Sequence, residues 1–379
     1  MQEKLKKIAV FPNDPLKAYY EKGEIKDRYF NPENMFDEIH VISFVEKDID
    51  EEVVKKLAGN ATLKIHCVGK INLKNMKEEK NRLINLVKNI KPDVIRTYNP
   101  LVQGWIATHC SKKLEIPLVL SLHGEYDRFR TMIKKQNFKQ YLKLMYTSKF
   151  VEPFVIKNAN RVICVYKVII PYAKKKGAKK IDLVYNRVDL SRFSKKPKNG
   201  ETKTLLIISV GRLIKQKNHE IIIRAVANLN AKLLIIGAGD DYDRLRKITR
   251  DLKIVNKVTF QHIVPHSEIH RWYQKADLFA LAMKTDLESL PIPVLEAMAS
   301  GLPVVIPKPP SLELYDELGE GVILVENKPQ AFRKALEEII GNQDLKVKLS
   351  AKVLEKIKSF DGKIMEQKER KIYEELLNK

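Results

Sequence analysis

The chain has 379 residues, of which 44% are hydrophobic and 31% charged, and a formal net charge of +23. This length predicts two domains, and this composition is typical of a folded protein rather than a disordered chain. The longest apolar runs are far short of the roughly 20 residues that a membrane span needs, and the apolar stretch near the start is too short for a signal peptide. We therefore expect a cytoplasmic protein, either free or at the inner face of the cytoplasmic membrane.

The positive charge is concentrated in the first half of the chain. Residues 1–200 hold 41 basic and 22 acidic residues, whereas residues 201–379 hold 29 and 25. Residues 111–200 alone hold 22 basic and 6 acidic residues. This asymmetry indicates an anionic partner for the first half, which could be a nucleic acid, a membrane surface or a phosphorylated substrate.

The three cysteines indicate neither disulfides nor a metal site. Cys67, Cys110 and Cys164 are odd in number, far apart in the sequence and outside any CxxC pair. We expect reduced thiols in the core and no structural zinc.

Short β-branched runs alternate with longer amphipathic stretches along the first half. Continuous apolar strands between helices indicate a parallel sheet that is covered on both faces. The predicted strands are 7–11, 38–44, 63–68, 94–97, 118–122, 161–165 and 181–184.

A charged stretch with Pro and Gly at 194–202 predicts a linker, after which a second series of strands and helices begins. We expect an acceptor-side domain over 1–195, a second domain over 196–358, and a last helix over 359–379 that crosses back onto the first domain. Both halves read as Rossmann-like α/β units, and such sheets bind ligands at the carboxyl ends of their strands. The sequence therefore predicts a site in a cleft between the domains. The second series of predicted strands is 204–210, 232–236, 257–261, 278–282, 303–306 and 322–325.

Two glycine-containing loops follow strands of the second half. Gly211 allows close backbone approach to a ligand, and Arg212 and Lys217 on the same loop could grip one diphosphate. Ordinary solvated charges remain an equally open interpretation. Gly237 lies in Ile-Gly-Ala-Gly-Asp-Asp, which is only a weak nucleotide-binding signal, and a tight strand-to-helix turn is the alternative. A base pocket formed by Gly237 and by backbone groups of His262 and Val264 is our expectation, with a plain loop at 262–264 left open.

The segment 286–305, DLESLPIPVLEAMASGLPVV, is the most specific motif of the second half. It predicts a helix beginning near 289–293, whose free N–H groups and dipole favour a phosphate. Glu296 lies about one turn inside this helix, where its carboxylate could accept two hydrogen bonds from a ribose diol. Glu288, on the preceding loop, would face the reacting end of the same ligand. The alternative is a helix with one capping and one exposed acid, which would leave Glu296 buried in an apolar run without a partner.

With these motifs in order, the chain resembles glycosyltransferase family 4, whose members have the GT-B fold. The resemblance covers nearly the whole chain and rests on Gly-Arg-Leu at 211–213, IIGAGDD at 235–241 and EAMASGLPVV at 296–305. It implies two Rossmann-like parallel-sheet domains facing a central cleft. It also implies that Arg212 and Lys217 hold the diphosphate, Glu296 the ribose and Glu288 the donor sugar. Pro291 departs from the family pattern because it lacks an N–H, so Leu290 or Ile292 must supply that phosphate donor.

The first half offers candidates at the ends of its predicted strands. His123 follows an apolar strand and, in placement, resembles the family's active-site histidine, although a core or capping histidine is the alternative. Asp127 is a further polar contact or a helix cap. The family's Gly-Gly loop after the first strand is absent, so Lys22 and Gly23 are expected to replace it. We add Tyr98 and Asn99 as acceptor-side candidates.

Residues 128–150 form a basic segment with seven Lys and Arg residues and no acid. Its apolar residues recur at helical spacing. This pattern suits a helix lying on an anionic bilayer, and it equally suits a helix packed on the domain with its lysines outside.

Together these features predict a retaining glycosyltransferase that uses a nucleotide diphosphate sugar, linked to UDP or GDP. The expected acceptor is a hydroxyl of a glycan, lipid-linked or cell-envelope molecule. We expect no metal and no cofactor, because Arg212, Lys217 and the helix N-terminus can neutralise the leaving diphosphate. A nucleotide-sugar epimerase or hydrolase on the same fold stays open. A nucleic-acid-binding protein is a weaker alternative, because no basic–aromatic module of a known type occurs and Glu288 and Glu296 would be unexplained.

Overall fold

The computed structural model describes residues 5–193, 204–284, 290–309 and 316–378. The chain divides into two compact units, which we call unit 1 (residues 1–185 with 365–379) and unit 2 (residues 186–364). This division falls before the expected 195/196 boundary, and it places the C-terminal segment with the N-terminal half.

Unit 1 is built on a parallel sheet in which seven described strands have the order β3-β2-β1-β4-β5-β6-β7. The chain order reverses between β1 and β4, which makes their carboxyl ends the switch point of the sheet. The inner strands β1, β2, β4, β5 and β6 are almost entirely buried because helices cover both faces of the sheet. They are β1 (Lys7–Phe11), β2 (Glu38–Ser43), β3 (Thr62–Cys67), β4 (Val94–Thr97), β5 (Leu118–Leu122), β6 (Arg161–Cys164) and β7 (Ile181–Leu183).

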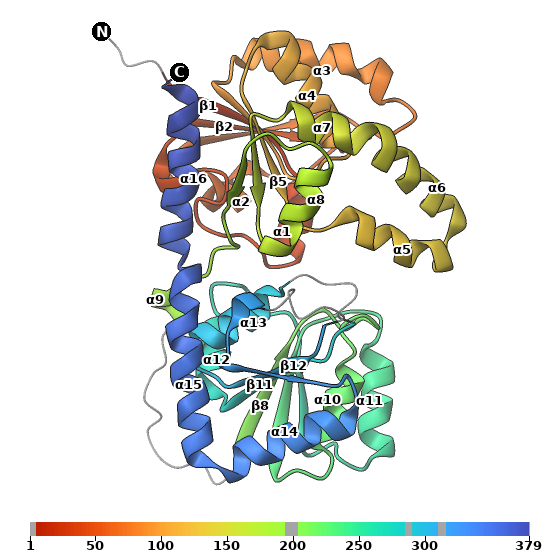
Figure 1. Cartoon of the computed structure of the whole chain (residues 1–379), viewed down its shortest axis with the longest axis vertical. Coiled ribbons are helices and arrows are strands. Elements are labelled where there is room, and N and C mark those ends of the chain that lie inside the picture. The colour runs from red at the N-terminus through yellow and green to blue at the C-terminus, as the bar shows by residue number, and fades with distance from the viewer. Residues whose placement is uncertain (1–4, 194–203, 285–289, 310–315, 379) are drawn as a thin grey trace. The chain divides into compact units, whose positions relative to one another are not determined.

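The helices of unit 1 include one from the far end of the sequence. This helix, α16 (Gly362–Leu377), buries Met365, Ile372 and Tyr373 in the same core as β1 and β2, and Figure 1 shows it along unit 1. The others are α1 (Leu16–Glu21), α2 (Glu51–Val54), α3 (Met76–Ile90), α4 (Val102–Leu114), α5 (Tyr126–Gln136), α6 (Phe138–Tyr146), α7 (Glu152–Asn158) and α8 (Ile170–Lys175).

Unit 2 holds a second parallel sheet, with six described strands in the order β10-β9-β8-β11-β12-β13. Its switch point lies between β8 and β11. The strands are β8 (Leu205–Val210), β9 (Ala231–Ile236), β10 (Val258–Gln261), β11 (Leu278–Ala280), β12 (Val304–Pro307) and β13 (Val322–Val325).

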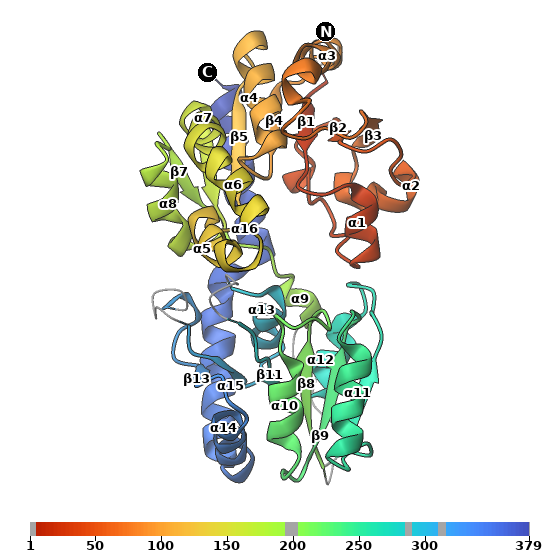
Figure 2. The ribbon, with the colours of Figure 1, turned by 90° about the vertical axis from the view of Figure 1, so that its right-hand side faces the viewer.

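Helices cover both faces of the second sheet, and Figure 2 shows α10 and α11, which pack side by side on one of them. Ile222, Leu245 and Leu336, from α10, α11 and α14, share one core with Leu233 and Leu278 of the sheet. On the opposite face, the ring of Tyr273 in α12 packs 6.1 Å from that of Phe279. The helices are α9 (Leu190–Phe193), α10 (His219–Val226), α11 (Tyr242–Asp251), α12 (Ile269–Lys275), α13 (Ile292–Ala299), α14 (Pro329–Gly341) and α15 (Gln343–Ile357).

The predicted fold class, two Rossmann-like parallel-sheet domains, is confirmed. The predicted linker at 194–202 lies outside the described residues. Two local expectations were wrong. The basic segment is not one helix, because Asn137 has extended backbone angles and separates α5 from α6 while capping Gln140. Cys67 is exposed rather than in the core, because β3 is an edge strand.

Candidate functional site

In unit 2 the loops after β8 and β9 are joined through their backbones. The Leu213 N–H donates to the Ala238 carbonyl at 2.8 Å, and the Gly211 N–H donates to the Ile236 carbonyl at 3.0 Å. A Cβ on Gly237 would lie 2.1 Å from the Gly211 carbonyl oxygen, and its φ of +152° is one that other residues rarely adopt. Gly237 is therefore required for the close approach of the two loops. The N–H of Gly237 donates to the Gln261 carbonyl at 3.0 Å. In the predicted base pocket Gly237 would therefore contact the nucleotide base through its carbonyl rather than its N–H.

The predicted diphosphate cations are on the loop after β8. Arg212 is exposed, and the half-buried Lys217 lies along Gly211, where an added Cβ would be 3.6 Å from its Cδ. The Lys284 N–H donates to the Gln216 carbonyl at 2.9 Å, which ties this loop to the segment after β11. The structure thus brings the two cations to the switch point between β8 and β11, the usual ligand position in such sheets.

His219, a residue that the sequence analysis missed, lies behind this loop. It begins α10, is fully buried, and its Nδ1 is 3.2 Å from the Ser209 hydroxyl. Burial, with the nearby charge of Lys217, lowers the pKa of His219 to about 4. Its ring is therefore neutral at physiological pH. The sequence signal was a histidine directly after Lys-Asn at the end of the glycine loop.

Glu296, the predicted ribose ligand, is buried on α13 with only 4% of its surface exposed. Its Oε1 is 2.8 Å from His266 Nε2, and its Oε2 accepts a hydrogen bond from the Tyr273 hydroxyl at 3.0 Å. The argument against the structural alternative, that Glu296 would then be buried without a partner, therefore does not hold, because His266 and Tyr273 are its partners within the protein. Each carboxylate oxygen has two lone pairs, so Glu296 keeps acceptor capacity for a hydroxyl beside His266.

The start of α13 offers fewer N–H groups than a typical helix. Pro291 is the N-cap residue and Pro293 occupies the first turn, so neither has an N–H to donate. Leu290 is buried and Ile292 half-buried at this end of the helix, and the role of their N–H groups in phosphate binding stays a prediction. Glu288 falls within 285–289, outside the described residues.

The predicted base-pocket residues follow β10, which pairs with β9. His262 is exposed and Val264 half-buried. The hydrogen bond from Gly237 to Gln261 places this loop beside the glycine loop. All three predicted base contacts therefore lie at the same end of the second sheet.

In unit 1 the predicted histidine stands at the carboxyl end of β5. The ring centroids of His123 and Tyr98 are 5.8 Å apart. Within the part of the chain that the structure describes, the buried His123 Nε2 has no hydrogen-bond partner. Burial, with the nearby charge of Arg96, lowers the pKa of His123 to about 4. A neutral imidazole with an unpaired nitrogen is suited to a polar contact with a ligand.

A buried charge pair lies under this histidine, and the sequence analysis missed it. Arg96 of β4 pairs with Glu369 of α16 at 3.1 Å and donates to the Ser121 hydroxyl at 2.7 Å. Its guanidinium also lies 5.0 Å from the centre of the Tyr98 ring. Arginine in an otherwise apolar strand was the available signal, but its partner is more than 270 positions away in the sequence.

The other acceptor-side candidates surround the ends of β1 and β4, where each makes structural contacts. Asn99 is buried, caps the Leu101 N–H at 2.9 Å and donates to Asn13 at 3.1 Å. Lys22 pairs with Asp14 at 2.8 Å, and Gly23 ends α1 with a φ of +68°. Tyr98 and Asn99 thus lie at the switch point of the first sheet, and Lys22 is held through Asp14 to the segment that follows β1.

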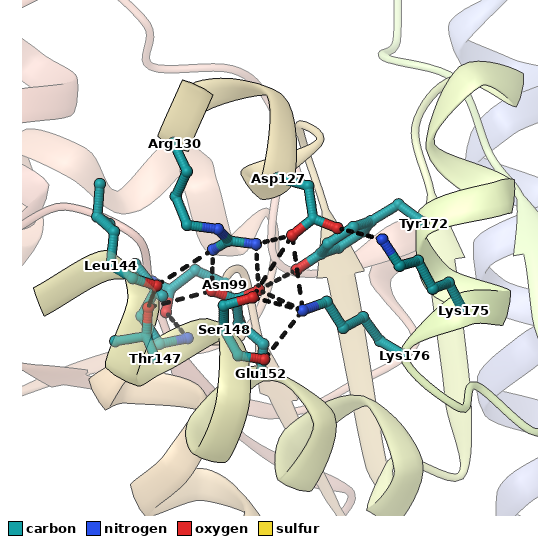
Figure 3. A network of polar contacts seen from close by, with 11 residues as sticks. Asn99, Asp127, Arg130, Leu144, Thr147, Ser148, Glu152, Tyr172, Lys175 and Lys176 are labelled. Atoms are coloured by element: carbon teal, nitrogen blue, oxygen red, sulfur yellow. Dashed lines mark hydrogen bonds and ion pairs between the residues drawn. The ribbon is translucent and has the colours of Figure 1, made fainter. Parts of the chain in front are cut away.

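Asp127 belongs to a different cluster, which Figure 3 shows. It lies in the first turn of α5, where it pairs with Arg130, and it also pairs with Lys175 at 3.2 Å and Lys176 at 3.6 Å. Burial raises the pKa of Asp127, but hydrogen bonds from Arg130 and Lys175 outweigh this and lower it overall. These contacts make Asp127 part of the anchor of α5.

The described residues lack two further features. They contain no cluster of three or more His, Cys, Asp or Glu side chains arranged to hold a metal ion. None of their helices has both the length and the apolar character to cross a membrane.

Comparison with known proteins places the chain in a family. The model "Glycosyltransferase Family 4" matches residues 37–192, and the model "Glycosyl transferases group 1" matches residues 191–356. An uncharacterized glycosyltransferase of Methanocaldococcus jannaschii is 22% identical over 298 residues, which are 77% of this chain and 78% of that protein.

A second relative and one solved structure agree with this assignment. The N-acetylgalactosamine-N,N'-diacetylbacillosaminyl-diphospho-undecaprenol 4-alpha-N-acetylgalactosaminyltransferase of Campylobacter jejuni is 28% identical over 48% of this chain, and the match spans only half of that protein. The crystal structure of Anabaena HepE in complex with UDP and glucose has a TM-score of 0.73 at 16% identity, covering 97% of this chain and 99% of that one. Because the two family models adjoin and together span residues 37–356, the chain belongs to the family 4 type of glycosyltransferases, with the GT-B fold.

Proposed function

We propose that the protein transfers a sugar from a nucleotide diphosphate sugar, linked to UDP or GDP, to a hydroxyl of a glycan, lipid-linked or cell-envelope acceptor. The observation that carries this proposal is the site of unit 2. There, two cations, the start of α13 and the buried Glu296 lie at the carboxyl end of one sheet. Similarity in fold to a structure that binds UDP and glucose supports the donor class.

The donor contacts follow from the chemistry of these groups. Arg212 and Lys217 would hold the diphosphate, with N–H groups of Leu290 and Ile292 adding to them at the helix start. Glu296 would accept hydrogen bonds from the ribose. Glu288 would contact the donor sugar near its reacting hydroxyls, by resemblance alone.

The reaction exchanges one C–O bond for another. The bond between the anomeric carbon and the diphosphate breaks, while the acceptor oxygen forms a bond to that carbon. In the proposed retaining mechanism the acceptor attacks from the same face, and its proton passes to the leaving diphosphate. Arg212 and Lys217 stabilise the negative charge that develops there, so the proposal requires no metal. His123, neutral at physiological pH, would hold the sugar by a hydrogen bond from or to Nε2.

The lipid-linked alternative among acceptors has support of its own. The Campylobacter relative acts, by its name, on a diphospho-undecaprenol substrate. The excess of basic residues in 1–200 would favour such an anionic acceptor.

A panel of UDP- and GDP-sugars tests the proposal in two steps. Thermal shift should first show one donor that raises the melting temperature, because a ligand of the folded state stabilises it by mass action. Product analysis with that donor should then give a glycoside when a lipid-linked or alcohol acceptor is present. Free sugar as the sole product would support a hydrolase, and an isomerised donor an epimerase. Stabilisation by duplex DNA and by none of the donors would contradict the proposal.

A further inference from the structure

Exposed apolar side chains concentrate on one short helical segment of unit 1. We call α5, α6 and the π-helical turn Thr147–Val151 the arm. Across the described residues thirteen large apolar side chains are exposed, and five of them lie between 138 and 150. Scattered exposed apolar residues are normal, but such a concentration usually marks an interaction surface. We name these five residues the ridge: Phe138, Leu142, Met145, Tyr146 and Phe150.

The ridge occupies one side of the arm because its first four members recur at intervals of four, three and one residues. At 3.6 residues per turn these positions share a face. The other side faces the domain. There Ile133 of α5 and Thr147 of the π-helical turn are buried. Figure 1 shows α6 on the outer side of unit 1, away from the strands. The ridge is therefore a surface that the fold leaves uncovered.

Cations border the ridge without any acid to offset them. Lys134, Lys143 and Lys149 are exposed, and the sequence has no Asp or Glu between 128 and 151. Lysines at such a border are attracted to a surface rich in phosphates. Nucleic acid and an anionic bilayer both provide such a surface. Only the bilayer also accepts a row of aliphatic and aromatic side chains at the boundary of its headgroups. The combination of ridge and border thus favours a membrane.

The base of the arm is held by a buried network, shown in Figure 3. Arg130 of α5 donates to Glu152 of α7 at 2.6 Å, and both side chains are buried, Glu152 completely. Glu152 also accepts a hydrogen bond at 2.6 Å from the hydroxyl of Tyr172 in α8, and it lies 3.5 Å from Lys176, which directly follows α8. Four charged or polar groups on three helices therefore fix where the arm leaves the domain.

The arm is also continuous with the candidate site. His123 directly follows the strand β5, and α5 begins at Tyr126, three positions after the histidine. The ridge therefore belongs to the chain segment that directly follows His123.

We propose that the arm docks on an anionic lipid bilayer, with the ridge inserted at the level of the headgroups and the bordering lysines against lipid phosphates. This deepens the proposed function and rests on it for one point, that the acceptor is held in a membrane. Docking itself requires neither donor nor catalysis, so it can be measured separately.

Vesicle flotation with the full chain tests this proposal. Vesicles of phosphatidylcholine alone are compared with vesicles containing about 30 mol% phosphatidylglycerol, a content that gives a strongly negative surface. The wild type should bind the anionic vesicles at least about tenfold better, and less so as salt is raised. The double variant Leu142→Ser/Phe150→Ser should bind about tenfold or more weakly, and Lys143→Gln/Lys149→Gln should lose the preference for anionic lipid.

A matched control uses two exposed apolar residues of unit 2. Val255→Ser/Val347→Ser removes similar exposed surface elsewhere and should bind vesicles as the wild type does. Equal binding by the wild type and the ridge variant would overturn the proposal. A wild type that did not bind vesicles, but formed a dimer in light scattering that the ridge variant lost, would also overturn it. Binding to duplex DNA instead of vesicles would overturn it as well. Donor binding by calorimetry should be the same in the wild type and the ridge variant, and its absence in both would count against the proposed function alone.

Discussion

Arg96 of β4 and Glu369 of α16 form an ion pair of 3.1 Å between side chains that are 3% and 8% exposed. The Tyr373 hydroxyl donates to the same carboxylate at 3.2 Å. This pair joins α16 to β4, the strand that Tyr98 directly follows. Arg96 also donates to Ser121, two residues before His123. The end of the chain therefore supports the candidate site of unit 1.

Glu369→Gln should destabilise the protein strongly, because it leaves the buried Arg96 charge without its counter-ion. Breaking a buried pair by removing one partner costs about 3–5 kcal/mol, measured as the free energy of urea unfolding. Glu374→Gln on the same helix is the control. It breaks an exposed pair with Arg370 and should change stability by less than about 0.5 kcal/mol. Equal losses in the two variants would contradict a structural role for the Arg96 pair.

Gly237→Ala should separate the loops after β8 and β9. Its Cβ would meet the Gly211 carbonyl oxygen at 2.1 Å, and its φ of +152° is strained for alanine. We expect a loss of about 1–3 kcal/mol in unfolding free energy, together with weaker nucleotide binding. Gly211→Ala is a matched comparison, because its Cβ would touch only Lys217 methylenes at 3.6 Å. A Gly211 variant as unstable as the Gly237 variant would refute this explanation.

Glu296→Gln should weaken binding of UDP or GDP by about 10- to 100-fold, as expected for loss of a hydrogen bond to a charged acceptor. Calorimetry with the ribose and 2′-deoxyribose nucleotides gives the sharper readout. The wild type should prefer the ribose form, and the variant should lose most of that preference. Tyr273→Phe, which removes a bond to Glu296 without touching the ligand, should keep it. Unchanged discrimination in the Glu296 variant would exclude the ribose role.

Stability should fall as pH is lowered from about 6.5 toward 4. Burial lowers the pKa of both His123 and His219 to about 4, so between these values the unfolded chain binds protons that the folded chain does not. The stabilising effect is complete above pH 6.5 and is lost as pH falls through the folded-state pKa. Each histidine adds a slope of up to about 1.4 kcal/mol per pH unit. His219→Asn should flatten the dependence measured by urea unfolding, and an unchanged slope would contradict this.

The fold could be predicted because its strands are continuous apolar runs and its helices have a clear period. The strands β1, β4, β5 and β13 have the predicted bounds, since Gly, Pro and charged residues punctuate them locally. Exposure of Cys67 could not be predicted, because it depends on β3 being at the edge of the sheet. The break at Asn137 was equally hidden, because the segment stays amphipathic on both sides of it.

The candidate site could be predicted only where its residues belong to local motifs. Arg212, Lys217 and Glu296 come from such motifs, and the structure places them at one end of the second sheet. Their supporting partners come from distant positions. His266 and Tyr273 reach Glu296 across 30 and 23 residues, and Glu369 reaches Arg96 from another end of the chain. Such pairs depend on tertiary packing, which a single sequence does not display.

The most direct test of the account is sugar transfer from the preferred donor by Arg212→Ala, compared with Lys215→Ala. Both residues are exposed cations on the loop after β8, but only Arg212 is assigned to the diphosphate. Removing a charge that stabilises the leaving group should lower kcat/KM by about 100-fold or more, while the Lys215 variant should remain within about twofold of the wild type. Undiminished transfer by the Arg212 variant would contradict the central claim that this loop binds the donor diphosphate.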